Sequence, residues 1–322
     1  MSKVLKMLAV ETGLSESAVQ RIMLSAPRRY KVYFIDKRNG EKRKISQPAR
    51  EVKLLQRALV KTLLDKLPIH SSATAYREGL SIRDNALPNI GIGPILKMDL
   101  TEFFPSIRKS DWVKYCRDSK CLEDADDIEL TSCLLFQKPK NGGPIQLAIG
   151  APSSPVLSNI IMFKFDQQIV DKVSHDKVRY TRYADDLTFS APRTGHLTRV
   201  KETVYSVIKS LEYPRLKVNS DKTIYVTSKF HRTVTGLTIA NDARITIGRA
   251  KKRQIRAAVH RASKGEMTTG ELQSLAGMLA FVNSVEPGFI TILRHKYGVR
   301  VVGRIQNTVR IKHGGRSTGV RA

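Results

Sequence analysis

The stretch "VRYTRYADDLTFSA", Val178 to Ala191, carries a strand pattern that is interrupted by two adjacent acidic residues. Its flanks alternate in the way that favours a β-hairpin. Asp185 and Asp186 stand side by side in the middle, although neighbouring carboxylates repel each other and strands disfavour Asp. A solvated turn would explain an isolated Asp-Asp pair. The pair therefore indicates a function only if a further carboxylate lies close to it.

A candidate for that carboxylate ends an apolar strand pattern in "ILKMDLTEFF", residues 95–104. Asp99 occupies a position where no structural role explains a charge. If this strand and the hairpin are neighbours, Asp99, Asp185 and Asp186 converge. Three hard, anionic oxygen donors suit Mg²⁺, and a pair of such ions supports in-line phosphoryl transfer. The sequence therefore predicts a site for two magnesium ions.

The chain of 322 residues is strongly basic, with 56 Lys and Arg against 29 Asp and Glu and a net charge of +27. Solubility needs a net charge magnitude of only about 2 to 8 in a small domain. The excess indicates a polyanionic partner, most often nucleic acid, with an anionic membrane surface as the alternative. The three cysteines lack metal or disulfide spacing, and no apolar run approaches the ~20 residues that span a bilayer. We expect a cytoplasmic protein without a membrane partner.

The order of strand and helix patterns lacks the regular alternation of a doubly wound sheet. It predicts an α+β fold in which helices cover one face of an antiparallel sheet. Two short helices are expected over residues 1–27, followed by a hairpin around Asn39-Gly40. Residues 108–138 read as mostly helical, strands are expected near 216–227 and 232–239, and the chain from 248 reads as helical and basic.

Beyond these patterns, the sequence resembles the reverse transcriptases of the retron type. "YADD" (183–186) and "MDLTEFFPSI" (98–107) resemble the polymerase motifs that carry the catalytic aspartates. Asn89 stands where retron enzymes usually have His, and Ile149 where many reverse transcriptases have Gln. Further matches, in chain order, are residues 28–59, "AYREGLSIRDNA" (75–86), "GAPSSPVLSNI" (150–160), "LKVNSDKT" (216–223), "VTGLTI" (234–239) and "LAGMLAFVNSVEP…KYG" (275–298).

The resemblance implies a right-hand polymerase of fingers, palm and thumb. It assigns residues 1–95, with parts of 108–150, to N-terminal helices and fingers, 96–240 to the palm and 241–322 to a basic helical thumb, which leaves no space for a ribonuclease H or endonuclease domain. It also implies an enzyme that copies a structured non-coding RNA into DNA with Mg²⁺ and dNTPs. Priming from a guanosine 2′-hydroxyl would give a branched RNA–DNA molecule, msDNA. A separate effector protein and a role in defence against phage belong to the same expectation.

Three alternatives remain open at this point. A group II intron maturase and an RNA-dependent RNA polymerase use the same chemistry. The expected absence of a further C-terminal domain argues against the first, and Phe104 argues against the second. An RNA-binding protein on an inactive polymerase fold would be expected to lose the three aspartates, and all are present.

The resemblance also assigns roles to single residues. Leu100 would add its carbonyl to the three metal-binding aspartates, and Lys222 would protonate the departing pyrophosphate, unless it is a structural lysine. Phe104 would lie under the incoming sugar and clash with a 2′-hydroxyl, whereas Phe103 would pack in the core. The remaining expected contacts are Lys42, Arg43 and Arg50 with the triphosphate, Gly150 and Ala151 with the nucleotide, and Asn85, Val234, Thr235 and Gly236 with nucleic acid.

The basic helix that begins near 249 has an amphipathic pattern. Ile255 and Val259 are expected to face inward. A solvated helix face is the alternative, but the net charge favours a face that follows the backbone of a duplex. The residues expected to point outward on that face are Arg249, Lys252, Arg256 and Lys264.

Overall fold

The structure, a computed structural model, describes residues 2–36, 40–91 and 93–308. Asn39, half of the expected hairpin turn, lies outside these residues. The chain forms two compact units, Met1–Pro88 with Ile92–Thr227 and Asn89–Gly91 with Ser228–Ala322, which are described separately below. Within the described ranges, every helix is too short or too polar to cross a membrane.

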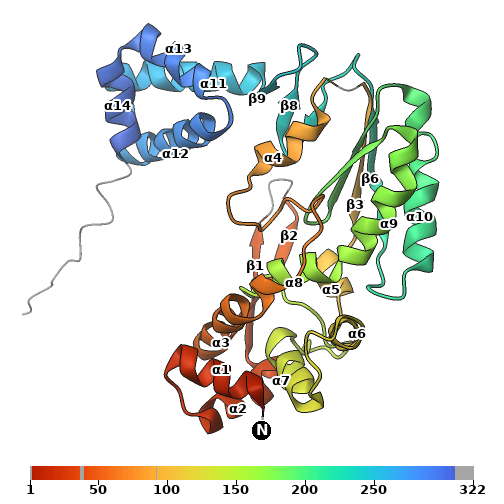
Figure 1. Cartoon of the computed structure of the whole chain (residues 1–322). Coiled ribbons are helices and arrows are strands. Elements are labelled where there is room, and N and C mark those ends of the chain that lie inside the picture. The colour runs from red at the N-terminus through yellow and green to blue at the C-terminus, as the bar shows by residue number, and fades with distance from the viewer. Residues whose placement is uncertain (1, 37–39, 92, 309–322) are drawn as a thin grey trace, which may run out of the picture. The chain divides into compact units, whose positions relative to one another are not determined.

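A four-stranded antiparallel sheet forms the centre of the first unit, in the order β4 (Arg179–Tyr183), β5 (Asp186–Ser190), β3 (Ile95–Leu100) and β6 (Val218–Val226). β3 lies between two partner strands and is almost wholly buried, in agreement with its near-continuous apolar run. Helices α9 (Phe163–Val173) and α10 (Val200–Ser210) lie side by side along one face of the sheet (Figure 1). The predicted α+β fold with an antiparallel sheet is therefore confirmed.

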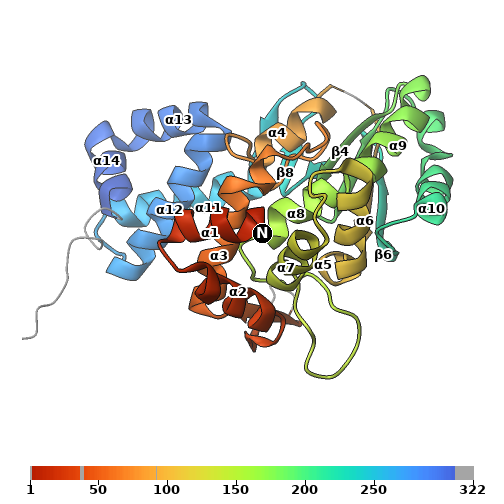
Figure 2. The same ribbon diagram turned by 60° about the horizontal axis from the view of Figure 1, so that its bottom comes forward.

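A helical cluster builds the N-terminal part of the same unit (Figure 2). Ser15 caps the second helix as its sequence predicts, by accepting a hydrogen bond from the Ala18 amide. Asp127 ties the first helix to the cluster, because its carboxylate accepts hydrogen bonds from the Lys3 and Val4 amides. The four helices are α1 (Lys3–Thr12), α2 (Glu16–Ser25), α3 (Arg50–Thr62) and α7 (Ala125–Leu135).

Shorter elements complete the first unit. Strands β1 (Tyr30–Asp36) and β2 (Lys42–Pro48) pair antiparallel from Tyr30 opposite Pro48 to Asp36 opposite Lys42, so the expected hairpin is present. The helical prediction for 108–138 is also confirmed. The remaining helices are α4 (Ile82–Ala86), α5 (Phe103–Ser106), α6 (Lys109–Ser119) and α8 (Ser154–Ile161).

The second unit combines a small antiparallel sheet with four helices. The single strand predicted over 232–239 is wrong in detail, because a turn with positive φ at Thr235 and Gly236 divides it into two. Glu286 links the sheet to the helices, since its carboxylate accepts hydrogen bonds from the Thr246 hydroxyl at 2.8 Å and the Lys252 ammonium at 2.5 Å. The elements are β7 (Thr233–Val234), β8 (Leu237–Ile239), β9 (Ile245–Thr246), α11 (Arg249–Ser263), α12 (Thr269–Val285), α13 (Pro287–Tyr297) and α14 (Val299–Asn307).

A buried hydrogen bond between α6 and α7 gives the first test of this packing. The Trp112 indole donates to the Thr131 hydroxyl at 3.0 Å, and both side chains are fully buried. Thr131→Val keeps the shape but leaves the indole N–H without an acceptor. We expect it to lower the free energy of unfolding by about 1–3 kcal/mol, measured by urea denaturation. Thr131→Ser retains the hydroxyl and should cost clearly less; equal losses would contradict the assigned bond.

Candidate active site

The sheet register brings the three acidic residues together. Asp99 on β3 stands directly opposite Asp186 on β5, and cross-strand partners have Cα atoms about 4.5–5.5 Å apart. The Leu100 amide donates to the Asp185 carbonyl at 3.1 Å, which holds the turn against the end of β3. Asp99 and Asp185, which are 86 positions apart in the sequence, thus meet where the two inner strands of the sheet end, as the sequence predicts.

The turn between β4 and β5 is short and strained. Tyr183 pairs with Asp186, so only Ala184 and Asp185 form the turn. Asp186 is therefore the first residue of β5, and only Asp185 of the acidic pair lies in the turn. Ala184 has φ 58°, a left-handed conformation that usually requires Gly in such turns. A non-glycine residue held there indicates that the surrounding structure determines the backbone.

The acidic residues disfavour one another's charge. Partial burial raises the pKa of the Asp185 carboxyl, and the nearby charge of Asp99 adds to this effect. Partial burial likewise raises the pKa of Asp186 to about 6, with the charges of Asp185 and Asp99 as further causes. The site therefore has an excess of negative charge that a cation would relieve.

One cation already reaches the site from β6. Four residues of β6, 220–223, stand opposite Met98 alone, and this bulge carries Lys222. The Lys222 ammonium lies 3.1 Å from both carboxylate oxygens of Asp99, and this bond raises the pKa of Lys222. The Lys222 side chain is 62% exposed, so the pair contributes little to stability.

The donor set fits Mg²⁺. Within the described ranges, no three His, Cys, Asp or Glu side chains are drawn closely enough together to form a metal site as they stand. The carboxylates nevertheless occupy neighbouring backbone positions, supply the hard oxygens that Mg²⁺ prefers, and include one, Asp99, that already binds a cationic group. Asp99, Asp185 and Asp186 are the residues that would hold the ions.

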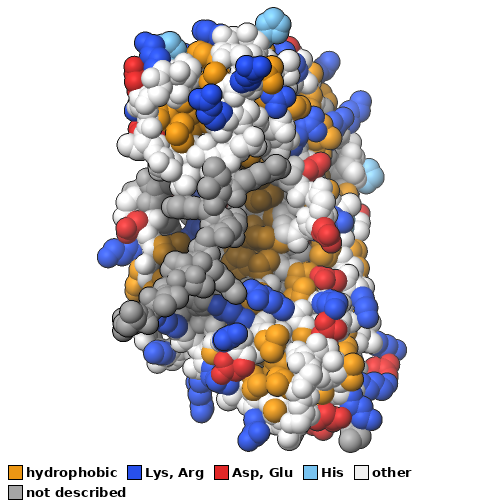
Figure 3. Space-filling view, turned by 90° about the vertical axis from the view of Figure 1, so that its left-hand side faces the viewer, with side chains coloured by type: hydrophobic (Ala, Val, Ile, Leu, Met, Phe, Trp, Pro, Cys, Tyr) orange, Lys and Arg blue, Asp and Glu red, His pale blue; other side chains and the backbone are white. Residues whose placement is uncertain are grey.

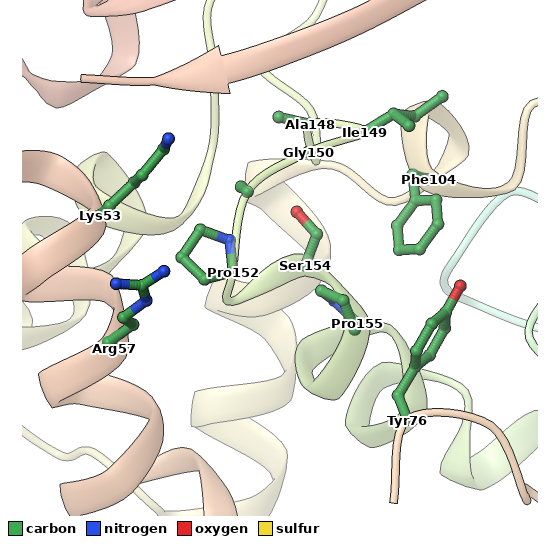
Figure 4. A pocket seen from close by; sticks show the side chains of 11 residues that line it. Lys53, Arg57, Tyr76, Phe104, Ala148, Ile149, Gly150, Pro152, Ser154 and Pro155 are labelled. Carbon is green, nitrogen blue, oxygen red and sulfur yellow. The ribbon is translucent and has the colours of Figure 1, made fainter. Parts of the chain in front are cut away.

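A pocket of about 330 Å³ lies in the same unit. Phe104 and Tyr76 form one side of it, with their ring centroids 6.2 Å apart (Figure 4). Burial raises the pKa of the Tyr76 hydroxyl, and the charge of Asp185 adds to this effect, so Tyr76 lies within electrostatic reach of Asp185. Lys53 and Arg57 of α3 line the opposite side, beyond Pro152. These two basic residues were not among the contacts expected from the sequence, although their spacing of one helical turn was a usable signal.

The loop that contains Gly150 forms the floor between these two sides. Gly150 has φ 118°, and a Cβ there would lie 3.0 Å from the Ile45 side chain and 3.2 Å from the Ser46 carbonyl. Ala151 is buried and lines the pocket. The Ile149 carbonyl accepts a hydrogen bond from the Ser46 amide at 2.8 Å. The glycine is therefore required by close packing of this loop against β2, a reason that the sequence did not reveal.

The expected triphosphate contacts differ in their positions. Arg43 is exposed on β2, and its charge acts on Asp185 by lowering the pKa of that carboxyl. Lys42 and Arg50 are exposed at the starts of β2 and α3. The described residues that line the pocket include none of these three.

Two of the expected nucleic-acid contacts are buried. Asn85 is fully buried, where its side-chain oxygen accepts a hydrogen bond from the Thr74 hydroxyl at 2.9 Å. Val234 is also fully buried, in the second unit. Both side chains pack inside the protein, so a contact of either residue with nucleic acid stays a prediction from the resemblance. Thr235 is half-buried and Gly236 exposed in the turn between β7 and β8.

The basic helix α11 is only partly as expected. Ile255 and Val259 are fully buried, which confirms its inward face. Lys252 pairs with Glu286, and the Arg256 guanidinium lies 5.2 Å from the centre of the Phe289 ring, so these two do not point outward as predicted. The exposed basic residues of this helix include Arg249, Arg253 and Arg261, and Lys264 directly after its last residue is exposed as well. On the face of the molecule shown in Figure 3, Lys and Arg side chains outnumber Asp and Glu.

Comparisons with known proteins agree with this geometry. Residues 35–255 match the family model described as "Reverse transcriptase (RNA-dependent DNA polymerase)". The chain is 34% identical to the Retron Ec83 reverse transcriptase of Escherichia coli, over 86% of this chain and 89% of the relative. It is 33% identical to the Retron Ec86 reverse transcriptase of the same species, over 89% and 88%.

Likeness to solved structures is weaker. Apo telomerase from Candida tropicalis, truncated from its C-terminal domain, is 14% identical with a TM-score of 0.44, over 72% of this chain and 60% of that one. A likeness at that level supports no inference. The family model and the two bacterial relatives are sufficient on their own to show the family of this chain. The chain belongs to the reverse transcriptase family, and within it to the retron reverse transcriptases, so it is an RNA-directed DNA polymerase with the right-hand polymerase fold.

Proposed function

We propose that this enzyme copies a structured non-coding RNA into DNA, starting from a 2′-hydroxyl of that RNA, to give a branched RNA–DNA molecule. The observation that carries the catalytic part is the register of β3 and β5, which sets Asp99 opposite Asp186 with Asp185 in the adjoining turn. The RNA template follows from membership of the retron reverse transcriptases. The branched product and its guanosine primer rest on the resemblance in sequence.

The acidic residues would bind two Mg²⁺ ions together with the phosphates of the incoming dNTP. When bound, these ions activate the attacking hydroxyl and stabilise the leaving pyrophosphate. Cation binding would favour the charged forms of Asp185 and Asp186, whose pKa values are raised by partial burial and, to a smaller extent, by the neighbouring carboxylates. Lys222, whose ammonium is bound to Asp99, would donate a proton to the leaving group, and the Leu100 carbonyl would be the fourth oxygen donor.

The pocket beside the acidic residues would receive the nucleotide. Phe104 is half-buried and faces the pocket, where its ring would exclude a ribose 2′-hydroxyl. Gly150 and Ala151 would border the nucleotide through backbone atoms. Arg43 would contact the triphosphate, since its charge already acts on Asp185. Lys42 and Arg50 would make weaker contacts with the triphosphate.

The wider assignments are proposals of the same origin. Residues 1–95 with parts of 108–150 would be the fingers, 96–240 the palm and 241–322 the thumb, with Arg249, Lys264, Thr235 and Gly236 on the nucleic acid. The separate effector protein, the role in defence against phage and the cytoplasmic location stay predictions from the sequence.

The metal-binding role is tested by Asp185→Asn. We expect DNA synthesis to fall by roughly 10²–10³-fold, because the change removes several kcal/mol of transition-state stabilisation. The measurement is extension of labelled DNA by the purified protein with its genomically adjacent RNA, dNTPs and Mg²⁺. Asp171→Asn, which changes an exposed acid on α9, should retain full activity. Persistent synthesis by Asp185→Asn would refute the metal assignment.

The sugar-selecting role is tested by Phe104→Ala. Removing the ring should admit ribonucleotides, so that the preference for dNTPs over rNTPs falls by roughly tenfold or more. The measurement is the ratio of kcat/KM for matched dNTP and rNTP substrates. Phe103→Leu is the control, because Phe103 is buried and should affect stability without changing that ratio. An unchanged ratio in Phe104→Ala would make Phe104 a packing residue.

The cost of holding a charge at Asp186, from burial and from the neighbouring carboxylates, is tested by the stability of Asp186→Asn without metal. The pKa of Asp186 is raised to about 6, so its charge destabilises the folded state above that pH, and the effect disappears toward the ordinary Asp pKa of about 3.9. We expect a melting temperature roughly 1 to 3 °C above wild type at pH 7.5, a small gain because the side chain is partly solvated. The gain should shrink toward pH 4 and in Mg²⁺. A lower melting temperature at pH 7.5 would contradict the electrostatic account.

A further inference from the structure

Directly behind the acidic turn lies a fully buried ion pair. Arg182 on β4 and Asp166 on α9 both have no exposed side-chain surface. The Arg182 Nε lies 2.8 and 3.1 Å from the two Asp166 oxygens, and its Nη2 lies 2.6 Å from Oδ2. The Tyr180 hydroxyl also donates to Asp166 at 2.8 Å. This two-pronged geometry fixes the plane and direction of the guanidinium.

The remaining nitrogen of Arg182 reaches the turn itself. Its Nη1 donates to the Ala184 carbonyl at 3.1 Å and to the Asn159 side-chain oxygen at 3.1 Å. Ala184 is the residue with the strained left-handed φ, and it directly precedes Asp185. The buried guanidinium therefore holds the peptide group from which the acidic turn begins.

Asn159 extends the same contacts to the nucleotide pocket. Its side-chain amide donates to the Ala75 carbonyl at 2.8 Å, and Ala75 directly precedes Tyr76, which lines the pocket and has φ 60°. Two residues with positive φ, one beside the acidic residues and one in the pocket, are thus held by a single hydrogen-bonded group of side chains from β4, α8 and α9.

A buried ion pair is a poor source of stability, because the loss of hydration offsets much of the attraction. Apolar side chains of similar volume would pack between β4 and α9 at least as well. They could not, however, fix the direction of a carbonyl group. The burial and the number of bonds on this guanidinium point to a role in geometry.

We propose that Arg182, oriented by Asp166 and Asn159, is a positioning residue that sets the acidic turn at the separation from Asp99 needed to bind divalent cations. This inference rests on the proposed function of the acidic residues. Residues around a metal site that orient its ligands typically change metal affinity or activity by 10–100-fold when mutated. Arg182 does so through the backbone of Ala184 rather than by touching a ligand side chain.

The test compares Arg182→Lys with Tyr180→Phe. Arg182→Lys keeps the buried charge but loses the planar fork, whereas Tyr180→Phe removes one bond to Asp166 and leaves every Arg182 bond in place. The measurement is the Mg²⁺ concentration that gives half of the maximal rise in melting temperature, with Mg²⁺ alone and no nucleotide. We expect this concentration to rise roughly tenfold in Arg182→Lys. It should stay at the wild-type value in Tyr180→Phe, even if both variants lose thermal stability.

A second measurement uses DNA synthesis on the RNA template. Arg182→Lys should need roughly tenfold more Mg²⁺ for half-maximal kcat, with activity recovering at high Mg²⁺. Asn159→Ala, which leaves the ion pair intact, should raise both the Mg²⁺ requirement and the KM for dNTP, and it decides the matter if Arg182→Lys does not fold. A folded Arg182→Lys with wild-type Mg²⁺ requirement, or an Asn159→Ala with both constants unchanged, would overturn the proposal. If wild type made no DNA, the proposed function would be refuted. The Mg²⁺ dependence of the melting temperature, measured without nucleotide, would still test the role of Arg182.

Discussion

Mutual repulsion among carboxylates on neighbouring strands is the constraint that the rest of this site has to satisfy. Asp99 and Asp186 face each other across an antiparallel pair, and Asp185 adjoins them in a two-residue turn. Without a cation such groups tend to separate or take up protons: partial burial raises the pKa values of Asp185 and Asp186, and the neighbouring carboxylates raise them further. The fold opposes their separation with fixed elements: a central strand that is paired on both sides, and a turn whose backbone is held from behind.

The alternation of side chains along β4 explains how this strand can both lead into the acidic turn and contribute the buried arginine that holds it. Successive side chains point to opposite faces of a sheet. Tyr183 pairs with Asp186, whereas Arg182 pairs with Leu187 and binds Asp166 of α9. The acidic residues are thus on the face opposite the helices, while the charge that holds the turn is buried beneath them. The buried guanidinium of Arg182 and the acidic residues are linked through the peptide group of Ala184. This group lies at the end of β4 and accepts a hydrogen bond from Arg182.

The sequence predicted those parts of this arrangement that depend on local pattern. The acidic pair, the apolar strand that ends at Asp99, the hairpin, the helices and the inward face at Ile255 and Val259 are all encoded within short windows. The other parts depend on partners far away in the chain. Arg182 in a strand pattern reads as a solvent-facing residue, and only the packing of α9 turns it into a buried ion. Gly150 reads as a nucleotide contact, and only the approach of β2 gives the steric reason for it.

The same distinction limits what net charge reveals about contacts. A charge of +27 predicts the class of partner, because long-range attraction to a polyanion depends on the sum. A particular contact depends instead on whether a cationic side chain is already engaged. Lys252 forms an ion pair with Glu286, Arg256 lies over the ring of Phe289, and Arg182 forms a buried ion pair with Asp166. The sequence does not distinguish these three residues from other basic residues, yet the charge of each interacts with another group of the protein itself. Tertiary structure therefore decides which cations stay accessible: on α11, Arg249 and Arg253 are exposed, whereas Arg261 is paired with Glu271.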